Sequence, residues 1–399
     1  MTRSDFSVAI PPHVLAALDR LNENGYEAFA VGGCVRDSLL GRVPNDWDIC
    51  TSALPEQTQA VFCDHRVVPT GVKHGTVTVI FGEPLEITTY RIDGAYLDSR
   101  RPAQVTFTDR LVDDLARRDF TVNAMALDRS GRVFDAFGGL DDLKNRVIRC
   151  VGDPETRFNE DALRIMRAVR FAATLDFTVE EATERAVHKL RGNLGSIAVE
   201  RIREELTGLL GGRCAAVLTR FADVLGVILP EIVLDPVTAE RIERASCLPV
   251  KLALLTQGRD AEAVLRRLRY PNAVIAQTVA AAGYPPEALR PEKPALRRLL
   301  GQCGAGNSVL VLEFARLTGR LTEQEADEAS ALLDQIIARG DCVTLAQLAV
   351  DGKAVSEQLG VTGRAVGAVL ERLLAAVIDE KAENTADQLL EYAKTHLKY

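Results

Sequence analysis

The sequence lacks three features that would assign it to a specialised class of protein. Its eight cysteines include no pair separated by two residues and no evenly spaced set, which argues against a zinc site or a disulfide scaffold and favours a reducing cytoplasm. No window approaches the ~18 uninterrupted apolar residues of a membrane span, and the N-terminus, MTRSDFSVAI, has no secretory-signal pattern. The net charge of −8 disfavours a general nucleic-acid coat. We therefore predict a soluble, cytoplasmic globular protein with no membrane partner.

The organisation of the chain changes near residue 158. At ~150 residues per domain, 399 residues predict two to four domains. In the first ~150 residues, short β-type runs such as HGTVTVIF and LEITTYR alternate with helical patches, which is typical of an α/β or α+β domain built on one sheet. Beyond residue 158 the segments are rich in Ala, Leu, Arg and Glu with a 3.6-residue period. The sequence therefore predicts a mixed head followed by a long helical body.

The stretch FAVGGCVRDSLLGRVPNDWDIC carries the first chemical signal. An expected strand ends in Gly32 and Gly33, and Arg36 and Asp37 then open a helix, so that backbone amides can approach an anion at the helix N-terminus. Asp46 and Asp48 flank Trp47, and the period of a strand places both carboxylates on one face, where they can hold Mg²⁺. A plain turn and an exposed loop pair are the alternatives for each motif alone, but the two motifs at this spacing favour a site.

The order of further motifs resembles a known family. GGCVRD and DWD are followed by GVKHGTVTV, LEITTYR, RRDFTVNAMAL, DAFGGLDDL, EDALRIMRAVRF and ERIREELTGLL. This order is similar to that of the class II tRNA nucleotidyltransferases and bacterial poly(A) polymerases, members of the polymerase-β-like nucleotidyltransferase superfamily. The resemblance covers residues 25–210. It implies an α+β catalytic head at 1–150 with a small, mostly antiparallel sheet, then an all-α neck that recognises the nucleotide at 151–215, a helical body at 216–300 and a tRNA-contacting helical tail at 301–399.

The resemblance also implies a metal-dependent reaction. Asp46 and Asp48 would bind two Mg²⁺ ions, which activate the RNA 3′-hydroxyl and stabilise the leaving pyrophosphate. A third carboxylate is usual on a neighbouring strand, and Glu86 is our candidate for this catalytic role. The alternative is that Glu86 is a cross-strand partner of Arg91 or Lys73.

Further residues are implied to bind the nucleotide outside its base. Gly33 and Arg36 would hold the triphosphate, and Arg118 and Asp119 resemble the pair that reads the ribose. We expect Asn123, in the same motif, to be structural.

The segment EDALRIMRAVRF predicts a two-sided helix. At ~100° per residue the apolar side chains fall on one side, while Asp161, Arg164, Arg167 and Arg170 form a tilted stripe on the other. A solvated basic face is the common alternative for such a pattern. The resemblance instead implies that Asp161 and Arg164 read the incoming base, that Arg167 and Arg170 reach the triphosphate, and that Glu160 acts as a charge at the helix N-terminus.

The proposed base readers select by hydrogen-bond polarity. Asp161 accepts and Arg164 donates, which matches the exocyclic amine and the adjacent ring-nitrogen acceptor of both cytosine and adenine. Uracil and guanine present a carbonyl beside a ring N–H, so both bonds would be reversed. Buried polar groups that are mismatched cost ~1–3 kcal/mol each, and this cost discriminates bases without a nucleic-acid template.

Two further segments carry expectations about the product and the RNA. The polar stretch at 90–107, with Arg100 and Arg101, corresponds to a loop that the family uses in switching from C to A addition; its presence favours full CCA addition, with an ordinary surface loop as the alternative. Residues 263–299 carry seven basic and two acidic side chains, which either contact tRNA phosphates or form a charged helix surface.

We therefore predict an enzyme that adds CCA to the 3′ end of tRNA from CTP and ATP, with Mg²⁺ as cofactor and no DNA partner. A poly(A) polymerase and an A-only-adding tRNA nucleotidyltransferase remain as alternatives on the same scaffold. A catalytically silent RNA-binding scaffold is the alternative from another class.

Overall fold

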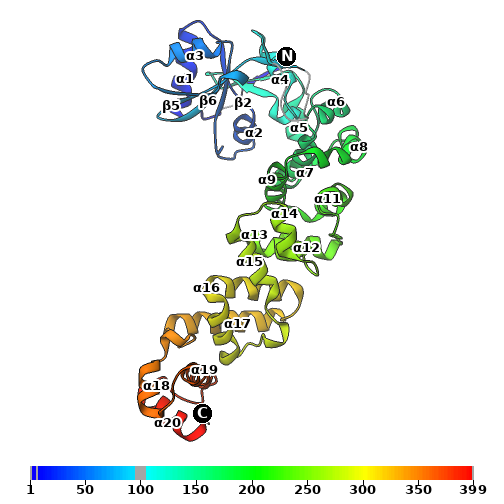
Figure 1. Ribbon diagram of the computed structural model, residues 1–399. Coiled ribbons are helices and arrows are strands. Elements are labelled where there is room, and N and C mark those ends of the chain that lie inside the picture. The colour runs from blue at the N-terminus through cyan, green and yellow to red at the C-terminus, as the bar shows by residue number, and fades with distance from the viewer. Residues whose placement is uncertain (1, 6–7, 95–104, 398–399) are drawn as a thin grey trace. The chain divides into compact units, whose positions relative to one another are not determined.

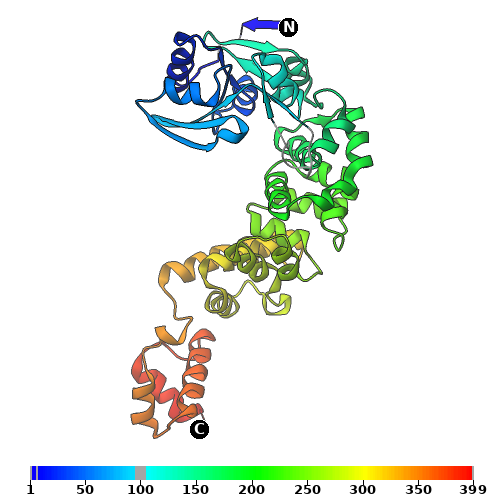
Figure 2. The same cartoon turned by 45° about the horizontal axis from the view of Figure 1, so that its top comes forward.

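A computed structural model describes residues 2–5, 8–94 and 105–397, which form two compact units, Met1–Val233 and Leu234–Tyr399. The first unit contains a mixed sheet with flanking helices and then a mainly helical segment, whereas the described part of the second contains helices alone (Figures 1 and 2). This arrangement confirms the predicted fold class. The finer division into head, neck, body and tail stays a prediction.

The head is built on one eight-stranded sheet. Its strands lie in the order β1 (Thr2–Asp5), β10 (Arg132–Asp135), β9 (Met125–Leu127), β2 (Ala28–Val31), β3 (Asp48–Thr51), β6 (Glu83–Thr89), β5 (Thr76–Phe81) and β4 (Arg66–Gly71). All neighbours in this sheet are antiparallel except β3 and β6. Two-stranded sheets pair β7 (Arg91–Asp93) with β8 (Val105–Phe107), and β11 (Val147–Ile148) with β12 (Thr178–Val179).

Alternating side chains explain why the central strands are buried on both faces. In β2, Ala28 belongs to the apolar core that includes Val14 and Leu18 of α1 (Pro12–Glu23), while Phe29 and Val31 belong to a second core. Head helices also include α2 (Gly33–Leu39), α3 (Pro55–Val61), α4 (Leu111–Ala116) and α5 (Gly139–Asn145), with 3₁₀ turns η1 (Val72–His74) and η2 (Thr121–Asn123). The central strand β2 is therefore packed between two apolar cores.

Helices complete the first unit: α6 (Pro154–Glu160), α7 (Leu163–Leu175), α8 (Glu181–Leu190), the 3₁₀ turn η3 (Arg191–Ser196), α9 (Val199–Leu210), α10 (Ala215–Arg220) and α11 (Ala222–Ile228). Ile165, Met166 and Val169 of α7 are fully buried, as the predicted apolar side requires. The N-terminus of α6 follows local rules, because Asp153 accepts a hydrogen bond from the Thr156 amide and Pro154 occupies the first turn.

One prediction about this segment was wrong. Asp161 does not lie on the helix that carries Arg164; its extended backbone (φ −140°, ψ 103°) separates α6 from α7. Glu160 is the last residue of α6, so it is not a charge at a helix N-terminus. It instead contacts Arg157 and Arg164, at 2.8 and 2.7 Å.

The helices of the second unit enclose apolar clusters, of which one includes Leu296, Leu312 and Leu333 and another includes Val355, Leu373 and Leu389. Its helices are α12 (Pro236–Arg244), α13 (Leu248–Leu255), α14 (Ala261–Arg267), α15 (Asn272–Gly283), α16 (Lys293–Thr318), α17 (Glu323–Arg339), α18 (Gly352–Leu359), α19 (Arg364–Ile378) and α20 (Ala386–His396), with 3₁₀ turns η4 (Pro286–Ala288) and η5 (Leu345–Gln347). Among the described residues, no helix is long and apolar enough to cross a membrane.

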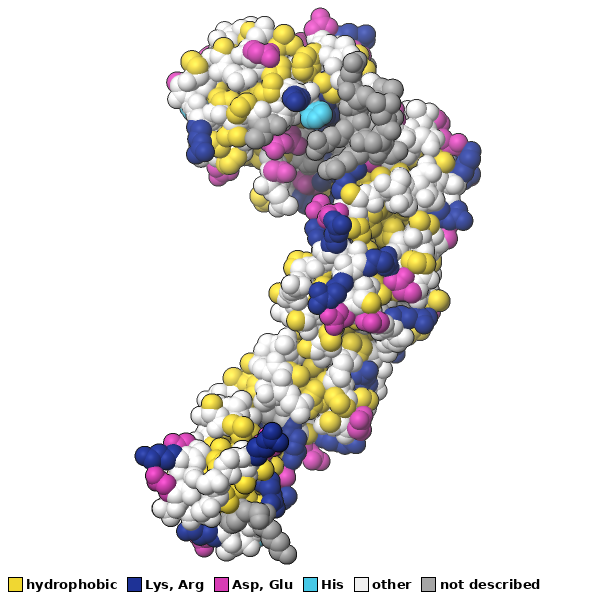
Figure 3. Space-filling model, in the orientation of Figure 1, with side chains coloured by type: hydrophobic (Ala, Val, Ile, Leu, Met, Phe, Trp, Pro, Cys, Tyr) yellow, Lys and Arg dark blue, Asp and Glu magenta, His cyan; other side chains and the backbone are white. Residues whose placement is uncertain are grey.

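The basic stretch at 263–299 is partly neutralised within this unit. Arg266 pairs with Glu262 at 2.7 Å, Arg297 with Asp341 at 2.7 Å, and Arg298 with Asp379. On the face seen in Figure 3, basic and acidic side chains lie interspersed over the helices. Contact of this stretch with tRNA stays a prediction.

Candidate active site

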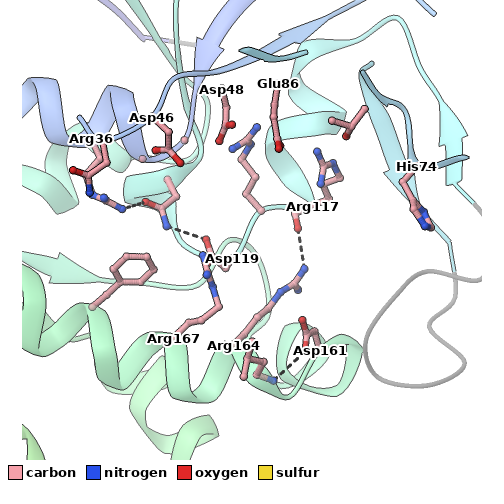
Figure 4. A pocket seen from close by; sticks show the side chains of 18 of the residues that line it. Arg36, Asp46, Asp48, His74, Glu86, Arg117, Asp119, Asp161, Arg164 and Arg167 are labelled. Carbon is pink, nitrogen blue, oxygen red and sulfur yellow. Dashed lines mark hydrogen bonds and ion pairs between the residues drawn. The ribbon is translucent and has the colours of Figure 1, made fainter. Parts of the chain in front are cut away.

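A pocket of about 970 Å³ in the first unit brings the predicted site residues together. Figure 4 shows carboxylates from the strands of the head on one side of this pocket, and arginines from the helical segment on the other. All eleven predicted residues line it: Gly33, Arg36, Asp46, Asp48, Glu86, Arg118, Asp119, Asp161, Arg164, Arg167 and Arg170. Residues as far apart as Gly33 and Arg170 therefore share one cavity.

The sheet register places the carboxylates next to one another. Asp48 begins β3, Asp46 precedes it by two residues, and Glu86 is the register partner of Asp48 on the parallel strand β6. The other register partner of Glu86 is Thr78, so neither Arg91 nor Lys73 lies opposite Glu86 in the sheet.

The electrostatics of this group fit a cation. Burial, and after it the charge of Asp46, raises the pKa of Asp48 to about 6, with Glu86 adding to the rise and Arg118 opposing it. No three His, Cys, Asp or Glu side chains in the described chain form a preformed metal cage. Mg²⁺ commonly binds through one or two carboxylates together with substrate phosphates, and the donor set present here suits that mode.

Gly32 and Gly33 shape the wall beside the carboxylates. Gly32 has φ +83°, and a Cβ there would lie 2.9 Å from a terminal nitrogen of Arg118. The positive φ therefore favours glycine at this position, and a side chain there would also have to displace the end of Arg118. One turn into α2, the buried Arg36 donates to Asp37 at two points, both 2.9 Å, and to Asn123 at 2.6 Å.

Asp119 is the centre of a buried hydrogen-bond network. It accepts bonds from the Asn123 amide at 3.1 Å and from Arg167 at 2.7 Å. Burial alone would raise its pKa, but Arg167 and Asn123 outweigh that effect and lower the pKa to about 2. Asn123, expected to be structural, thus lines the pocket and links Arg36 to Asp119.

The proposed base readers lie close together but are not free. Asp161 accepts two bonds from Arg201, at 2.8 and 3.4 Å, and one from the Leu163 amide at 3.0 Å. Arg164 donates to Glu160 at 2.7 Å and to the Arg117 carbonyl at 3.0 Å. Both side chains line the pocket, and these bonds do not use all the N–H donors of Arg164.

Comparison with known proteins identifies the family. Residues 28–149 match the family described as the poly A polymerase head domain, and residues 176–232 match the probable RNA and SrmB-binding site of polymerase A. The CCA-adding enzyme of Lactobacillus helveticus is 36% identical over 394 residues, 95% of each chain. The CCA-adding enzyme of Geobacillus thermodenitrificans is 38% identical over 414 residues, covering 97% of this chain and 99% of that one.

This chain belongs to the CCA-adding enzyme family. Its fold also matches the crystal structure of the Bacillus stearothermophilus CCA-adding enzyme in complex with CTP, with a TM-score of 0.81, 32% identity and coverage of 96% and 98% of the two chains. The protein is accordingly a tRNA nucleotidyltransferase, which confirms the predicted enzyme class.

Sequence reasoning missed several pocket residues of this CCA-adding family member. His74, Thr76 and Thr78 line the wall next to Glu86, Phe171 lies among the arginines, and Arg201 contacts Asp161. Alternation in GVKHGTVTV gave a usable signal for the threonines. Arg201 gave none, because it lies 40 residues after its partner. Arg100 and Arg101 lie outside the described residues.

Proposed function

We propose that the protein adds CCA to the 3′ end of tRNA from CTP and ATP, without a nucleic-acid template and in the cytoplasm. The observation that carries this proposal is one pocket with Asp46, Asp48 and Glu86 on one wall and Asp161 and Arg164 on another. The first group suits phosphoryl chemistry, and the second suits recognition of a base. The relatives named above support the same reaction.

The three carboxylates would hold two Mg²⁺ ions through Asp46 and Asp48, with Glu86 as the third carboxylate. Bound metal supplies positive charge for the reacting phosphate and lowers the pKa of the attacking 3′-hydroxyl. The neighbouring guanidinium of Arg118 keeps part of the negative charge balanced when Asp48 is ionised.

The triphosphate and the ribose of the nucleotide would be bound by the glycine turn and by the arginines of the pocket. Gly33 and Arg36 would hold the triphosphate together with Arg167 and Arg170. Arg118 and Asp119 would contact the ribose, whose 2′-hydroxyl can both donate and accept a hydrogen bond.

The base would be read by Asp161 and Arg164. Arg201 holds the Asp161 carboxylate at two points, and Glu160 holds Arg164, so the acceptor and the donor have fixed directions. Cytosine and adenine match this polarity, whereas uracil and guanine leave both protein groups mismatched.

Incubation of the enzyme with Mg²⁺, tRNA lacking CCA and single NTPs tests the reaction. We expect two residues from CTP, a third from ATP once CC is present, and no addition from UTP or GTP. Ready incorporation of UTP or GTP, or no addition, would contradict the proposal. A long A tail would indicate a poly(A) polymerase, and A addition restricted to CC-ended tRNA would indicate an A-only enzyme.

A matched pair of variants tests the base readers. Asp161→Asn keeps the size of the side chain but gives it a donor, so we expect the CTP-over-UTP ratio of kcat/KM to fall by at least roughly tenfold. Glu155→Gln removes the same charge from an exposed residue of α6 whose partner is Lys189, outside the pocket, and should keep the ratio. Equal ratios in both variants would sink the assignment.

We also propose that residues 1–150 form the head, 151–215 the neck, 216–300 the body and 301–399 a tail that contacts tRNA. Ultraviolet crosslinking of the full chain to tRNA, read by mass spectrometry, tests the last point. Crosslinks restricted to residues before 301 would contradict it.

A further inference from the structure

One aromatic ring in the pocket is surrounded by cations. Phe171 of α7 is 5% exposed and has three guanidinium carbons close to its ring centroid: Arg170 at 4.1 Å, Arg36 at 5.1 Å and Arg167 at 5.3 Å. On another side the ring meets Phe120 edge-on, with 5.8 Å between centroids. The three arginines come from two helices, α2 and α7, that are far apart in the sequence.

The ring lessens the cost of collecting three like charges. The face of a phenyl ring carries negative partial charge, so a guanidinium within about 6 Å of its centre is attracted. Each arginine also has an acidic partner: Asp37 for Arg36, Asp119 for Arg167, and Glu205 for Arg170. A guanidinium has five N–H donors, and the bonds described leave donors on each arginine for an anionic ligand.

A glycine of the facing helix fixes the third arginine. A Cβ at Gly208 of α9 would lie 2.5 Å from Cδ of Arg170. The aliphatic part of Arg170 therefore lies directly against the α9 backbone while its guanidinium lies nearest to the Phe171 ring. The position of Arg170 therefore depends on glycine at position 208 as well as on the ring of Phe171.

We propose that Phe171 is a positioning residue that holds Arg36, Arg167 and Arg170 in one array for the triphosphate of the incoming nucleotide. This inference rests on the proposed function and adds a residue to it. It distinguishes Phe171 from an ordinary core residue, because an ordinary core residue would affect stability without changing the preference for three phosphates over one.

The test compares equilibrium binding of ATP and AMP to the full-length enzyme by isothermal titration calorimetry. In Phe171→Leu we expect the Kd of ATP to rise on the order of tenfold or more, and the Kd of AMP to change much less. Phe171→Tyr keeps the ring and should restore the ATP preference. Phe158→Leu makes the same change at a fully buried residue of α6 outside the pocket and should keep both values.

A second variant keeps the ring intact. Gly208→Ala adds the methyl group that displaces Arg170 and should also weaken ATP more than AMP, which tests the place of Arg170 in the array. Phe171→Met, which removes the ring but keeps a large apolar side chain, tests Phe171 if Phe171→Leu fails to fold. An unchanged ratio of ATP to AMP affinity in the folded variants would overturn the role of Phe171. A wild-type enzyme that fails to prefer ATP to AMP would instead contradict the triphosphate site of the proposed function.

Discussion

Removal of the buried charge of Asp114 should destabilise the first unit far more than removal of the charge of Asp113, its neighbour in the sequence. Asp114 of α4 is fully buried. Its carboxylate pairs with Arg117 at 2.8 Å and Arg118 at 3.4 Å, and it accepts a 3.4 Å bond from the Arg91 amide at the start of β7. Asp114→Asn keeps the shape of the side chain but leaves both guanidinium groups without this anion.

The structure sets the size of the effect. Breaking a buried ion pair by neutralising one partner costs ~3–5 kcal/mol. The side chains of Arg117 and Arg118 are each 17% exposed, so some solvation remains and we expect the lower end of that range. For a unit of this size, 1 kcal/mol corresponds to ~2–4 °C. The transition of the first unit should therefore fall by roughly 6–12 °C.

Asp113→Asn is the matched control. Asp113 is 24% exposed, and its partner Arg110 lies 3.8 Å away with 70% of its side chain exposed. Such pairs contribute ~0.2–1 kcal/mol. Differential scanning calorimetry of both variants at pH 7 tests the reasoning. Equal losses in both variants would refute the claim that burial makes the Asp114 ion pairs strongly stabilising. An Asp114→Asn transition within 2 °C of the wild type, which corresponds to ~1 kcal/mol or less, would refute it as well.

Three further outcomes follow from the pocket. Because the raised pKa of Asp48, about 6, reflects burial and then the charge of Asp46, Mg²⁺ affinity measured by calorimetry should rise about tenfold from pH 5 to 7; a flat profile would contradict this. Asp119 has a folded pKa of about 2, below its unfolded value of 3.8, so its stabilisation is complete above about pH 5 and is lost as the pH falls towards 2. Denaturant titration of Asp119→Asn should show a loss of ~2 kcal/mol at pH 7 and about half of that at pH 3; a loss independent of pH would argue against it. Arg201→Ala should let Asp161 rotate and lower the CTP-over-UTP ratio by roughly tenfold in single-nucleotide assays, whereas an unchanged ratio would show that Arg201 does not orient it.

Local sequence rules predicted the parts of the site whose geometry is set by one element. The DWD motif ahead of a strand placed Asp48 correctly, and the alternation in LEITTYR put Glu86 on a face that the parallel pairing of β3 and β6 brings next to it. The apolar side of α7 followed from its 3.6-residue period. In each case the spacing within a single element is enough to fix the face on which a side chain lies.

The features of the site that the sequence did not predict depend on contacts between distant segments. The break at Asp161 leaves its carboxylate accepting the Leu163 amide and the Arg201 guanidinium, and only the second of these lies far along the chain. A prediction from the 3.6-residue period considers only residues that are close in the sequence. It therefore placed Asp161 and Arg164 on one continuous helix. The same holds for Phe171, whose apolar type predicts core and whose cationic neighbours come partly from α2.

The ion pairs of Arg164 and Asp161 have a physical consequence for the proposed selectivity. A buried charge without a partner would destabilise the fold, and Glu160 and Arg201 supply partners for Arg164 and Asp161 that also fix the directions of their side chains. Under the proposed base reading, a matching base would gain hydrogen bonds without first ordering these side chains, because the entropy of ordering them is already lost in folding. A mismatched base would not gain bonds by rotating Asp161 or Arg164, since rotation would break an existing ion pair. Rejection of uracil and guanine would therefore depend on the ion pairs behind the base readers as much as on the readers themselves.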